Sequence, residues 1–312
     1  MMLYTDLSEI PAGYGPSAVT IGKFDGVHAG HRAVIGELLE EASARHARSV
    51  VVTFDRHPLA LLKPEKCPSS LVGNRQKTDL IAQTGVDDTV LLRFDEAFSQ
   101  KSPDAFVRDI LVEALHAVVV LVGADFRFGH KGAGTVDTLT EFGRQHGFEV
   151  RVVEDVAPKD GRRVSSTWIR ELLAQGEVRQ AAELLGHLPT VSGVVVHGAK
   201  RGRELGFPTA NLSPDSDGLI PSDGVYAGWL VRGDVSYPAA ISVGNNPTFD
   251  GVPQKQVEAY VLDETLDLYD DVVDVKFVER LRGQVAYRGI EPLIEQMHND
   301  VAKVRDILTQ TA

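Results

Sequence analysis

The sequence has little cysteine and no long apolar run, and both absences narrow what the protein can be. Its 312 residues include a single cysteine, Cys67, so no disulfide can form within the chain, and no Cys/His set has zinc-site spacing. No run of apolar residues is long enough to cross a membrane. The first residues carry Asp6 and Glu9 and do not resemble a signal peptide. We therefore expect a cytoplasmic protein without a membrane partner.

The sequence also has fewer basic than acidic residues. It contains 32 Lys and Arg and 44 Asp and Glu, which gives a formal net charge of −12. Nucleic-acid phosphates attract a basic surface, so we expect no nucleic-acid partner. Small anionic substrates remain compatible with this composition, because they respond to local charge. Hydrophobic residues make up 43% and charged residues 24%, as in folded proteins, and this length favours two domains. The composition leaves a homo-oligomer open.

The first part of the chain alternates apolar strand patterns with helical patterns. Val34, Ile35, Leu38 and Leu39 recur at helical spacing within residues 31–46. Further helices are marked by Phe106, Ile110 and Leu111, and by Leu139 with Phe142. The expected strands are 17–21, 49–53, 89–92, 117–122 and 149–153. Alternating strands and helices predict a Rossmann-like α/β domain with a parallel sheet, whose ligands bind beyond the carboxyl ends of the strands.

After residue 186 the pattern changes to strands separated by Gly, Pro and Asp turns. The expected strands are 190–196, 225–231, 237–243, 256–261 and 272–278. Consecutive strands without helices between them predict an antiparallel β-barrel. The chain ends in an amphipathic helix with Pro292 in its first turn. Its expected apolar face is Ile290, Leu293, Ile294, Met297, Val301, Val304 and Leu308. We predict two domains, 1–186 and 187–312.

A glycine-rich turn containing two histidines follows the first expected strand. It reads G-K-F-D-G-V-H-A-G-H over residues 22–31 and leads into a helix. Glycines allow a tight turn, and a helix N-terminus offers free N–H groups to a phosphate. His28 and His31 would lie on one side of the opening turn, where both can donate hydrogen bonds to phosphates. The competing interpretation is that one histidine caps the helix and the other packs.

Hydroxyl side chains precede another expected helix at residues 165–170, which read S-S-T-W-I-R. Ser165, Ser166 and Thr167 can cap that helix while presenting hydroxyls to a phosphate, and Arg170 follows one turn later. Arg163 adds a second cation just upstream. Without other information, an ordinary cap followed by a surface arginine is equally compatible with this pattern.

These two segments resemble the signature of the nucleotidylyltransferase superfamily, and the longer G-x-F-D-G-x-H-x-G-H form resembles that of prokaryotic bifunctional riboflavin kinase/FAD synthetases. Residues 53–58 (T-F-D-R-H-P, with Arg56 where the family has proline) and 123–129 (G-A-D-F-R-F-G) support the resemblance. It implies catalysis by His28, His31 and Arg170, and flavin contacts from Phe54 and His57. It also implies nucleotide binding by Gly22, Phe24, Asp25, Gly26, Gly30, Asp125, Arg163, Ser165, Ser166 and Thr167.

A second glycine-punctuated, basic segment lies at residues 198–211 and reads G-A-K-R-G-R-E-L-G-F-P-T-A-N. It lacks the G-K-[ST] ending of a Walker A loop. Thr209 and Asn211 would present two neutral oxygens on one face of an extended segment, a set that suits Mg²⁺ together with ATP phosphates. From composition alone, a flexible basic loop is the simpler interpretation.

This segment resembles the riboflavin kinase signature, and residues 221–226, 244–249 and 257–263 continue the likeness. The resemblance implies that Thr209 and Asn211 bind Mg²⁺ and that Glu258 is the catalytic base. It also implies nucleotide binding by Gly198, Lys200, Gly202, Gly206 and Pro208. Residues 287–289 (Tyr-Arg-Gly) depart from the family's usual F-D-S.

The expected function is therefore a two-step enzyme that uses ATP to convert riboflavin to FMN and then FMN to FAD. One alternative is an adenylyltransferase that acts on another phosphate or carboxylate. An aminoacyl-tRNA synthetase is disfavoured by the net charge and by the absence of an anticodon-binding extension. A third alternative, from another class, is a flavin-binding carrier or regulator without catalysis.

Overall fold

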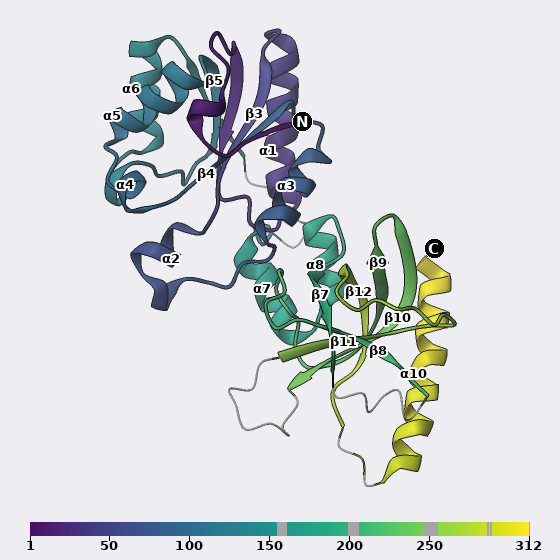
Figure 1. Ribbon diagram of the computed structural model, residues 1–312. Coiled ribbons are helices and arrows are strands. Elements are labelled where there is room, and N and C mark those ends of the chain that lie inside the picture. Colours follow the sequence, from purple (N-terminus) through teal and green to yellow (C-terminus); the bar gives the residue numbers. More distant parts are fainter. Residues whose placement is uncertain (155–160, 199–205, 246–254, 286, 288, 312) are drawn as a thin grey trace. The chain divides into compact units, whose positions relative to one another are not determined.

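The computed structural model describes residues 1–154, 161–198, 206–245, 255–285, 287 and 289–311. By its internal contacts the chain divides into two compact units, Met1–Ser165 and Ser166–Ala312. Each unit carries its own sheet (Figure 1). This division falls 21 residues before our sequence boundary at 186, because the helices over Ser166–Gln175 and Val178–Leu185 are grouped with the second unit.

The first unit is built on a six-stranded parallel sheet. Its strands are β1 (Met2–Tyr4), β2 (Ser17–Ile21), β3 (Arg48–Phe54), β4 (Asp88–Leu92), β5 (Ala117–Gly123) and β6 (Glu149–Val153). They run in the order β1-β4-β3-β2-β5-β6, so the five strands expected from the sequence are confirmed and the short edge strand β1 is additional. Strand β2 has β3 and β4 on one side of it in the sheet, whereas the later strands β5 and β6 lie on its other side. Such a reversal of strand order is where open α/β sheets bind ligands, just beyond the carboxyl ends of the strands.

Helices cover both faces of this sheet, as its continuous apolar strands predict. Helices α1 (Ala29–Ala44) and α3 (Asn74–Ala82) cover one face, where Ile35 and Leu38 are fully buried (Figure 1). The π-helix η3 (Val107–Ala114) and α6 (Val136–His146) cover the other, around the buried Leu111 and Leu139. Shorter helices in the loops are η1 (Leu7–Glu9), α2 (Pro58–Leu62), η2 (Pro64–Lys66), α4 (Glu96–Ser99), α5 (Pro103–Phe106) and η4 (His130–Gly132).

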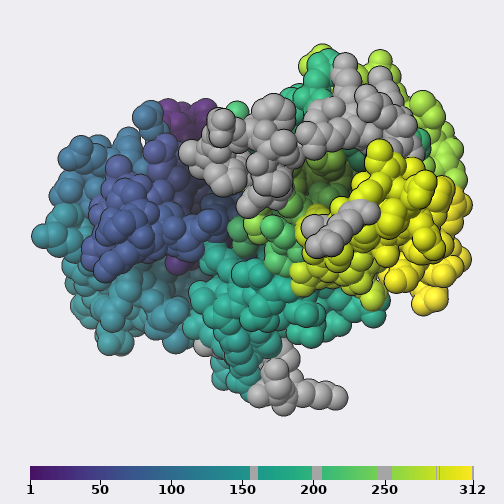
Figure 2. All heavy atoms as spheres, turned by 90° about the horizontal axis from the view of Figure 1, so that it is seen from below, coloured from purple at the N-terminus to yellow at the C-terminus, as the bar shows by residue number. Residues whose placement is uncertain are grey.

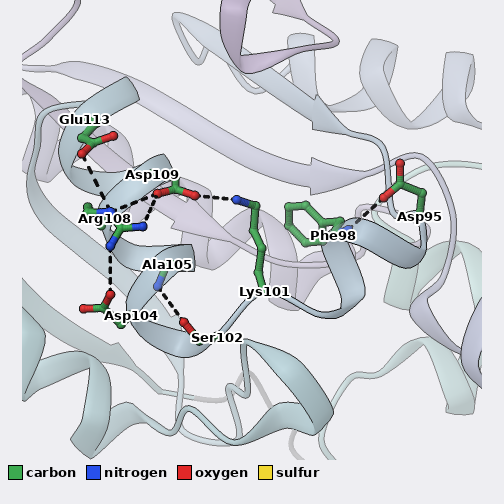
Figure 3. Close-up of polar contacts among 9 residues, drawn as sticks. All are labelled: Asp95, Phe98, Lys101, Ser102, Asp104, Ala105, Arg108, Asp109 and Glu113. Atoms are coloured by element: carbon green, nitrogen blue, oxygen red, sulfur yellow. Dashed lines mark hydrogen bonds and ion pairs between the residues drawn. The ribbon is translucent and has the colours of Figure 1, made fainter.

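The helix expected around Phe106, Ile110 and Leu111 is one α-helical turn, α5, that continues as the π-helix η3. All three apolar side chains are buried as expected, so the pattern located the helix but not its winding. On the outer side, Arg108 contacts Asp104 at 3.1 Å and Asp109 at 3.0 Å, and Lys101 reaches Asp109 at 2.5 Å (Figure 3). Such partly exposed pairs contribute little stability, about 0–1 kcal/mol each.

The second unit is a closed antiparallel barrel with flanking helices, which confirms the expected architecture. Its strands follow one another around the barrel in the order β10-β11-β8-β7-β12-β9. Helices α7 (Ser166–Gln175) and α8 (Val178–Leu185) precede it, and α8 packs on β12. The strands are β7 (Thr190–Val196), β8 (Thr209–Leu212), β9 (Gly224–Arg232), β10 (Val235–Asn245), β11 (Lys255–Val261) and β12 (Val272–Arg282).

The last helix, α10 (Ile290–Thr311), packs against β9, β10 and β12 and is visible at the surface in yellow (Figure 2). Val304 and Leu308 are buried, as the apolar pattern predicts. Ile290, the first residue of the helix, is 62% exposed, so burial of the expected apolar face does not extend to the start of the helix. Among the described residues, no helix is long and apolar enough to span a membrane.

An ion pair that the sequence did not reveal ties α10 to the barrel. Asp300 is almost fully buried and accepts hydrogen bonds from Arg282 Nε at 3.0 Å and Nη2 at 2.7 Å. Gln296 donates a further hydrogen bond to it at 2.8 Å. The ring of Tyr287, in the segment that departs from the family pattern, lies 5.9 Å from the Arg282 guanidinium. The end of β12 and the middle of α10 are thus held together by a bidentate pair.

Candidate functional site

The turn between β2 and α1 has an unusual backbone. Phe24, Gly26 and Val27 adopt positive φ angles of 48°, 83° and 41°. A left-handed conformation is unfavourable for a β-branched residue such as Val27, by roughly 1–3 kcal/mol. Both Phe24 and Val27 are buried, so packing holds the strained turn in place. Strain of this kind gathers at functional sites. The motif marked this turn, but only the structure shows where the strain lies.

His28 and His31 lie together at the N-terminus of α1, as the spacing predicts. Their rings stack with centroids 3.7 Å apart and planes 15° apart. His28 is also the N-cap: its Nδ1 accepts a hydrogen bond from the His31 backbone N–H at 3.3 Å. A neutral ring that accepts at Nδ1 carries its proton on Nε2. His28 therefore caps the helix, as the competing interpretation of the motif held. Its Nε2–H is not used by the cap and can still donate to a ligand.

Burial keeps both imidazoles neutral. His28 is almost fully buried, and burial, aided by the nearby Arg163 charge, lowers its pKa to about 4. The pKa of His31 is also well below its usual value, because of burial and then the neighbouring His28, Lys23 and Arg163. Within the described residues, the buried Nδ1 of His31 has no hydrogen-bond partner. Two neutral rings and an unsatisfied ring nitrogen at a helix N-terminus form an apt site for an anionic ligand.

The glycines of this turn leave room for the rings. A Cβ at Gly22 would lie 3.1 Å from the Phe24 ring, and one at Gly30 would lie 3.2 Å from His28 Cε1 and Nδ1. Asp25, expected to bind nucleotide, accepts a hydrogen bond from the backbone N–H of Leu71 at 2.8 Å. One of its oxygens thus fixes the turn to the segment before α3.

Two more expected nucleotide ligands pair with each other. Arg163 Nη1 lies 3.2 Å from Asp125 Oδ2, and both side chains are exposed. Ser165 ends the first unit, whereas Ser166, Thr167 and Arg170 lie in the first turns of α7 and belong to the second. Helix α7 begins at Ser166, as the hydroxyl-rich stretch predicts.

The expected flavin contacts lie at the end of β3. Phe54 makes edge contacts with the rings of Phe94, at 5.6 Å, and Phe98, at 5.7 Å. His57 caps α2 through a hydrogen bond from the Leu59 N–H to its Nδ1 at 3.1 Å. Arg56, which replaces the family's proline, is half exposed and pairs with Asp55 at 3.1 Å. The phenylalanines after β4 are additional aromatic neighbours that the motifs did not indicate.

The second site lies on two neighbouring strands of the barrel. Thr209 and Asn211 share one face of β8, and Asn211 stands opposite Glu258 of β11. Thr209 Oγ1 donates to Glu258 Oε2 at 3.4 Å, and Asn211 Nδ2 lies 3.3 Å from Thr209 Oγ1. The structure thus brings together the three residues expected to bind metal and to act as the base.

The donor set at this site fits a magnesium ion. The Thr209 hydroxyl and the Asn211 amide supply neutral hard oxygens, and Mg²⁺ usually completes its shell with phosphates and water. Gly198 leaves room for the Asn211 amide, because a Cβ at position 198 would overlap that amide and displace it. Of the other expected nucleotide ligands, Gly206 has a φ of 86° and Pro208 immediately precedes β8. Lys200 and Gly202 lie outside the described residues.

A pocket of about 270 Å³ adjoins Thr209. Aromatic and aliphatic side chains form most of its wall, with Tyr269 and Leu268 from the segment before β12. His197 lies against Tyr269, with ring centroids 4.0 Å apart. No sequence motif marks Leu268, Tyr269 or His197. The full lining is Val195, Pro208, Thr209, Ala210, Ala259, Val261, Glu264, Thr265, Leu266, Leu268 and Tyr269.

Two family models match successive parts of the chain. The family described as FAD synthetase matches residues 12–168, and the family described as riboflavin kinase matches residues 185–308. The bifunctional riboflavin kinase/FMN adenylyltransferase of Listeria monocytogenes is 37% identical over 97% of this chain and 93% of its own length. The protein of the same name from Escherichia coli K12 is 36% identical over 94% of this chain and 93% of its own.

A solved structure from Streptococcus pneumoniae, titled as a macrolide-efflux protein, has the same fold. It aligns with a TM-score of 0.86 and 29% identity over 97% of this chain and 98% of its own. Two family models match in order along the chain, and both relatives align over nearly their whole length. The chain belongs to the family of bifunctional riboflavin kinase/FMN adenylyltransferases.

Proposed function

We propose that this chain makes FMN and FAD with two sets of residues, one for each transfer from ATP. As a member of its family it is a riboflavin kinase and an FMN adenylyltransferase. The observation that carries our assignment of residues is the cluster of Thr209, Asn211 and Glu258 on β8 and β11, in a unit that does not contain the stacked His28 and His31.

In the kinase reaction we assign Glu258 as the general base. Its carboxylate accepts the proton of the terminal ribityl hydroxyl of riboflavin, whose oxygen attacks the γ-phosphorus of ATP, and ADP leaves. Thr209 and Asn211 would hold Mg²⁺, which supplies charge neutralisation for the phosphates. We assign the pocket beside Thr209 to the nucleoside of ATP, because its wall is largely apolar. Thr209 lines this pocket and is also one of the two residues that we assign to Mg²⁺.

In the adenylyltransferase reaction a phosphate oxygen of FMN attacks the α-phosphorus of ATP, and pyrophosphate leaves. No protein nucleophile is required. His28 donates from Nε2, and the N-terminus of α1 offers its N–H groups as negative charge builds on the phosphates. Arg163 and Arg170 add positive charge, and Phe54 and His57 contact the flavin. The assignments of Gly22, Phe24, Asp25, Gly26, Gly30, Asp125, Ser165, Ser166 and Thr167 to the nucleotide belong to the same proposal.

Two labelled forms of ATP test the proposal. The purified chain is incubated with riboflavin, Mg²⁺ and ATP labelled either at the γ- or at the α-phosphorus, and the flavins are separated by chromatography. We expect the γ-label in FMN and the α-label only in FAD, with release of pyrophosphate. Bound but unchanged riboflavin would contradict the proposal and favour a carrier. A labelled adduct with a substrate other than FMN would favour a different adenylyltransferase. Cytoplasmic location, oligomeric state and the absence of a nucleic-acid partner stay predictions from composition.

A further inference from the structure

Lys77 is a buried lysine that neither site assignment uses. It lies on the first turn of α3 and is only 7% exposed. Its Nζ donates a hydrogen bond to the backbone carbonyl of Phe54 at 2.5 Å. Lysine is rarely buried, because removing an ammonium group from water is costly unless other groups compensate. A buried ammonium therefore indicates an environment built to hold it.

Two carboxylates provide that environment. Burial lowers the pKa of Lys77, and the charges of Asp25 and Asp55 oppose this effect by favouring the ammonium form. Each carboxylate also holds a loop. Asp25 Oδ1 accepts the Leu71 N–H at 2.8 Å, and Asp55 Oδ1 accepts the Phe94 N–H at 2.8 Å. The Lys77 ammonium is thus near two carboxylates that each accept a backbone N–H from a separate segment, and Asp55 also pairs with Arg56.

These groups come from the carboxyl ends of three neighbouring strands. Asp25 lies in the strained turn after β2, Phe54 ends β3 and Asp55 follows it, and Phe94 follows β4. The turn after β2 leads to the stacked histidines, and the end of β3 leads to Phe54 and His57. The ammonium of Lys77 therefore donates to the segment to which we assign the flavin, and interacts electrostatically with Asp25 in the turn to which we assign the nucleotide.

We propose that Lys77 is a positioning residue for FMN adenylylation, which holds the turn at residues 22–28 and the segment 54–57 at a fixed separation. The inference rests on the adenylyltransferase assignment proposed above. Lys77 acts through the Phe54 carbonyl and the two aspartates and has no role as a proton donor or nucleophile. Small errors in the placement of two reactants slow a transfer strongly, by up to about 10²-fold per ångström. Loss of this link should therefore weaken FMN adenylylation and leave riboflavin phosphorylation unchanged.

The chain offers a matched control for substitution of Lys77. Lys101 is in the same unit and pairs with Asp109 at 2.5 Å, but its side chain is 30% exposed and it lies on the outer side of η3 (Figure 3). Lys77→Met and Lys101→Met remove the same charge and keep a similar chain length. The full-length chain also carries its own internal control, because riboflavin phosphorylation occurs in the second unit.

The test measures both reactions in each variant at a temperature where thermal unfolding shows every variant folded. For Lys77→Met we expect kcat/KM for FMN adenylylation to fall at least about tenfold, with KM raised for both FMN and ATP. Riboflavin phosphorylation should stay within about twofold, and Lys101→Met should match the wild type in both reactions. Lys77→Arg keeps the charge and should recover part of the lost kcat/KM.

A folded Lys77→Met variant with FAD synthesis within about twofold of wild type would overturn the proposal. So would a lower kcat with both KM values unchanged, since a misplaced pair of binding segments must alter binding. If Lys77→Met does not fold, Lys77→Arg decides: a raised KM for FMN at an unchanged melting temperature supports the role, and unaltered KM values reject it. A wild-type chain that made no FAD would instead refute the proposed function.

Discussion

The Thr209 hydroxyl donates to Glu258 Oε2 at 3.4 Å, across the neighbouring strands β8 and β11. These residues are 49 positions apart in the chain. Their register also places Glu258 directly opposite Asn211, so the expected base and both expected metal ligands share one small area of the barrel. In the kinase reaction proposed above, this hydroxyl orients the carboxylate that we assign as the base.

Replacement of that carboxylate tests the separation of the two activities. Glu258→Gln keeps the shape and removes the base, so riboflavin phosphorylation should fall by about 10²- to 10⁴-fold. FMN adenylylation should stay near the wild-type rate, because its residues lie elsewhere. Both reactions are followed by chromatography of the flavins, starting from riboflavin or from FMN. Loss of both reactions together would contradict separate sites.

Two glycines of α1 provide a matched pair for the His28 site. A Cβ at Gly30 would lie 3.2 Å from the His28 ring, so Gly30→Ala should displace the imidazole and lower the rate of FAD synthesis at least about tenfold. Gly36 is in the same helix, and a Cβ there would meet nothing within 4 Å. Gly36→Ala should leave both reactions unchanged and add about 0.5–1 kcal/mol of stability.

Initial rates and urea unfolding of the two variants check this prediction. A Gly30→Ala enzyme as active as Gly36→Ala would show that the position of the His28 ring does not matter for adenylyl transfer.

The lowered pKa of His28 predicts acid sensitivity of the first unit. In the unfolded chain His28 binds a proton below its ordinary pKa of 6.5, whereas in the folded chain it stays neutral down to about 4. The unfolded state therefore binds more protons between these values, and stability is lost as the pH falls through this window. For His28 alone the loss between pH 7.5 and pH 5 is about 2 kcal/mol.

His28→Asn is the matched variant for this effect, because asparagine also caps a helix and does not titrate. Urea unfolding of the first unit is measured at both pH values in the wild type and in the variant. The variant should lose less stability on acidification than the wild type. Equal losses in the two proteins would show that His28 is not the group responsible.

The buried pair of Arg282 and Asp300 predicts a stability effect that an exposed pair does not share. Asp300→Asn leaves the guanidinium without its carboxylate partner in a mostly buried setting, and should cost about 3–5 kcal/mol. Arg305, which is also on α10, pairs with Asp263, and both of these side chains are exposed. Asp263→Asn should therefore lower the free energy of unfolding by less than about 1 kcal/mol.

Chemical unfolding of both variants, with riboflavin kinase activity as a second readout, measures the difference. If the two substitutions had equal effects, the bidentate pair would not be what fastens α10 to the barrel.

Many of the candidate site residues could be found from local sequence patterns, but residues that depend on distant partners could not. The stacked histidines follow from a spacing of three residues at a helix start, and Thr209 with Asn211 from a spacing of two in a strand. Lys77 could not be found in this way, because nothing near it in the sequence distinguishes it from a surface lysine. Its burial depends on Asp25, Asp55 and the Phe54 carbonyl, which other strands bring to it.

The sequence by itself determined the two architectures, all the described strands except the short β1 and β8, and the segments that we propose carry the chemistry. It could do so because the alternation of side-chain direction in a strand and the turn of a helix both show in the local order of apolar and polar residues. Only the tertiary structure decided which strands are neighbours, and so where Glu258 meets Thr209, how η3 is wound and where Asp300 and Lys77 find their partners. Those contacts form only when the whole barrel closes and when the helices pack on the complete sheet. Contacts between residues far apart in sequence are set by the packing of every intervening element.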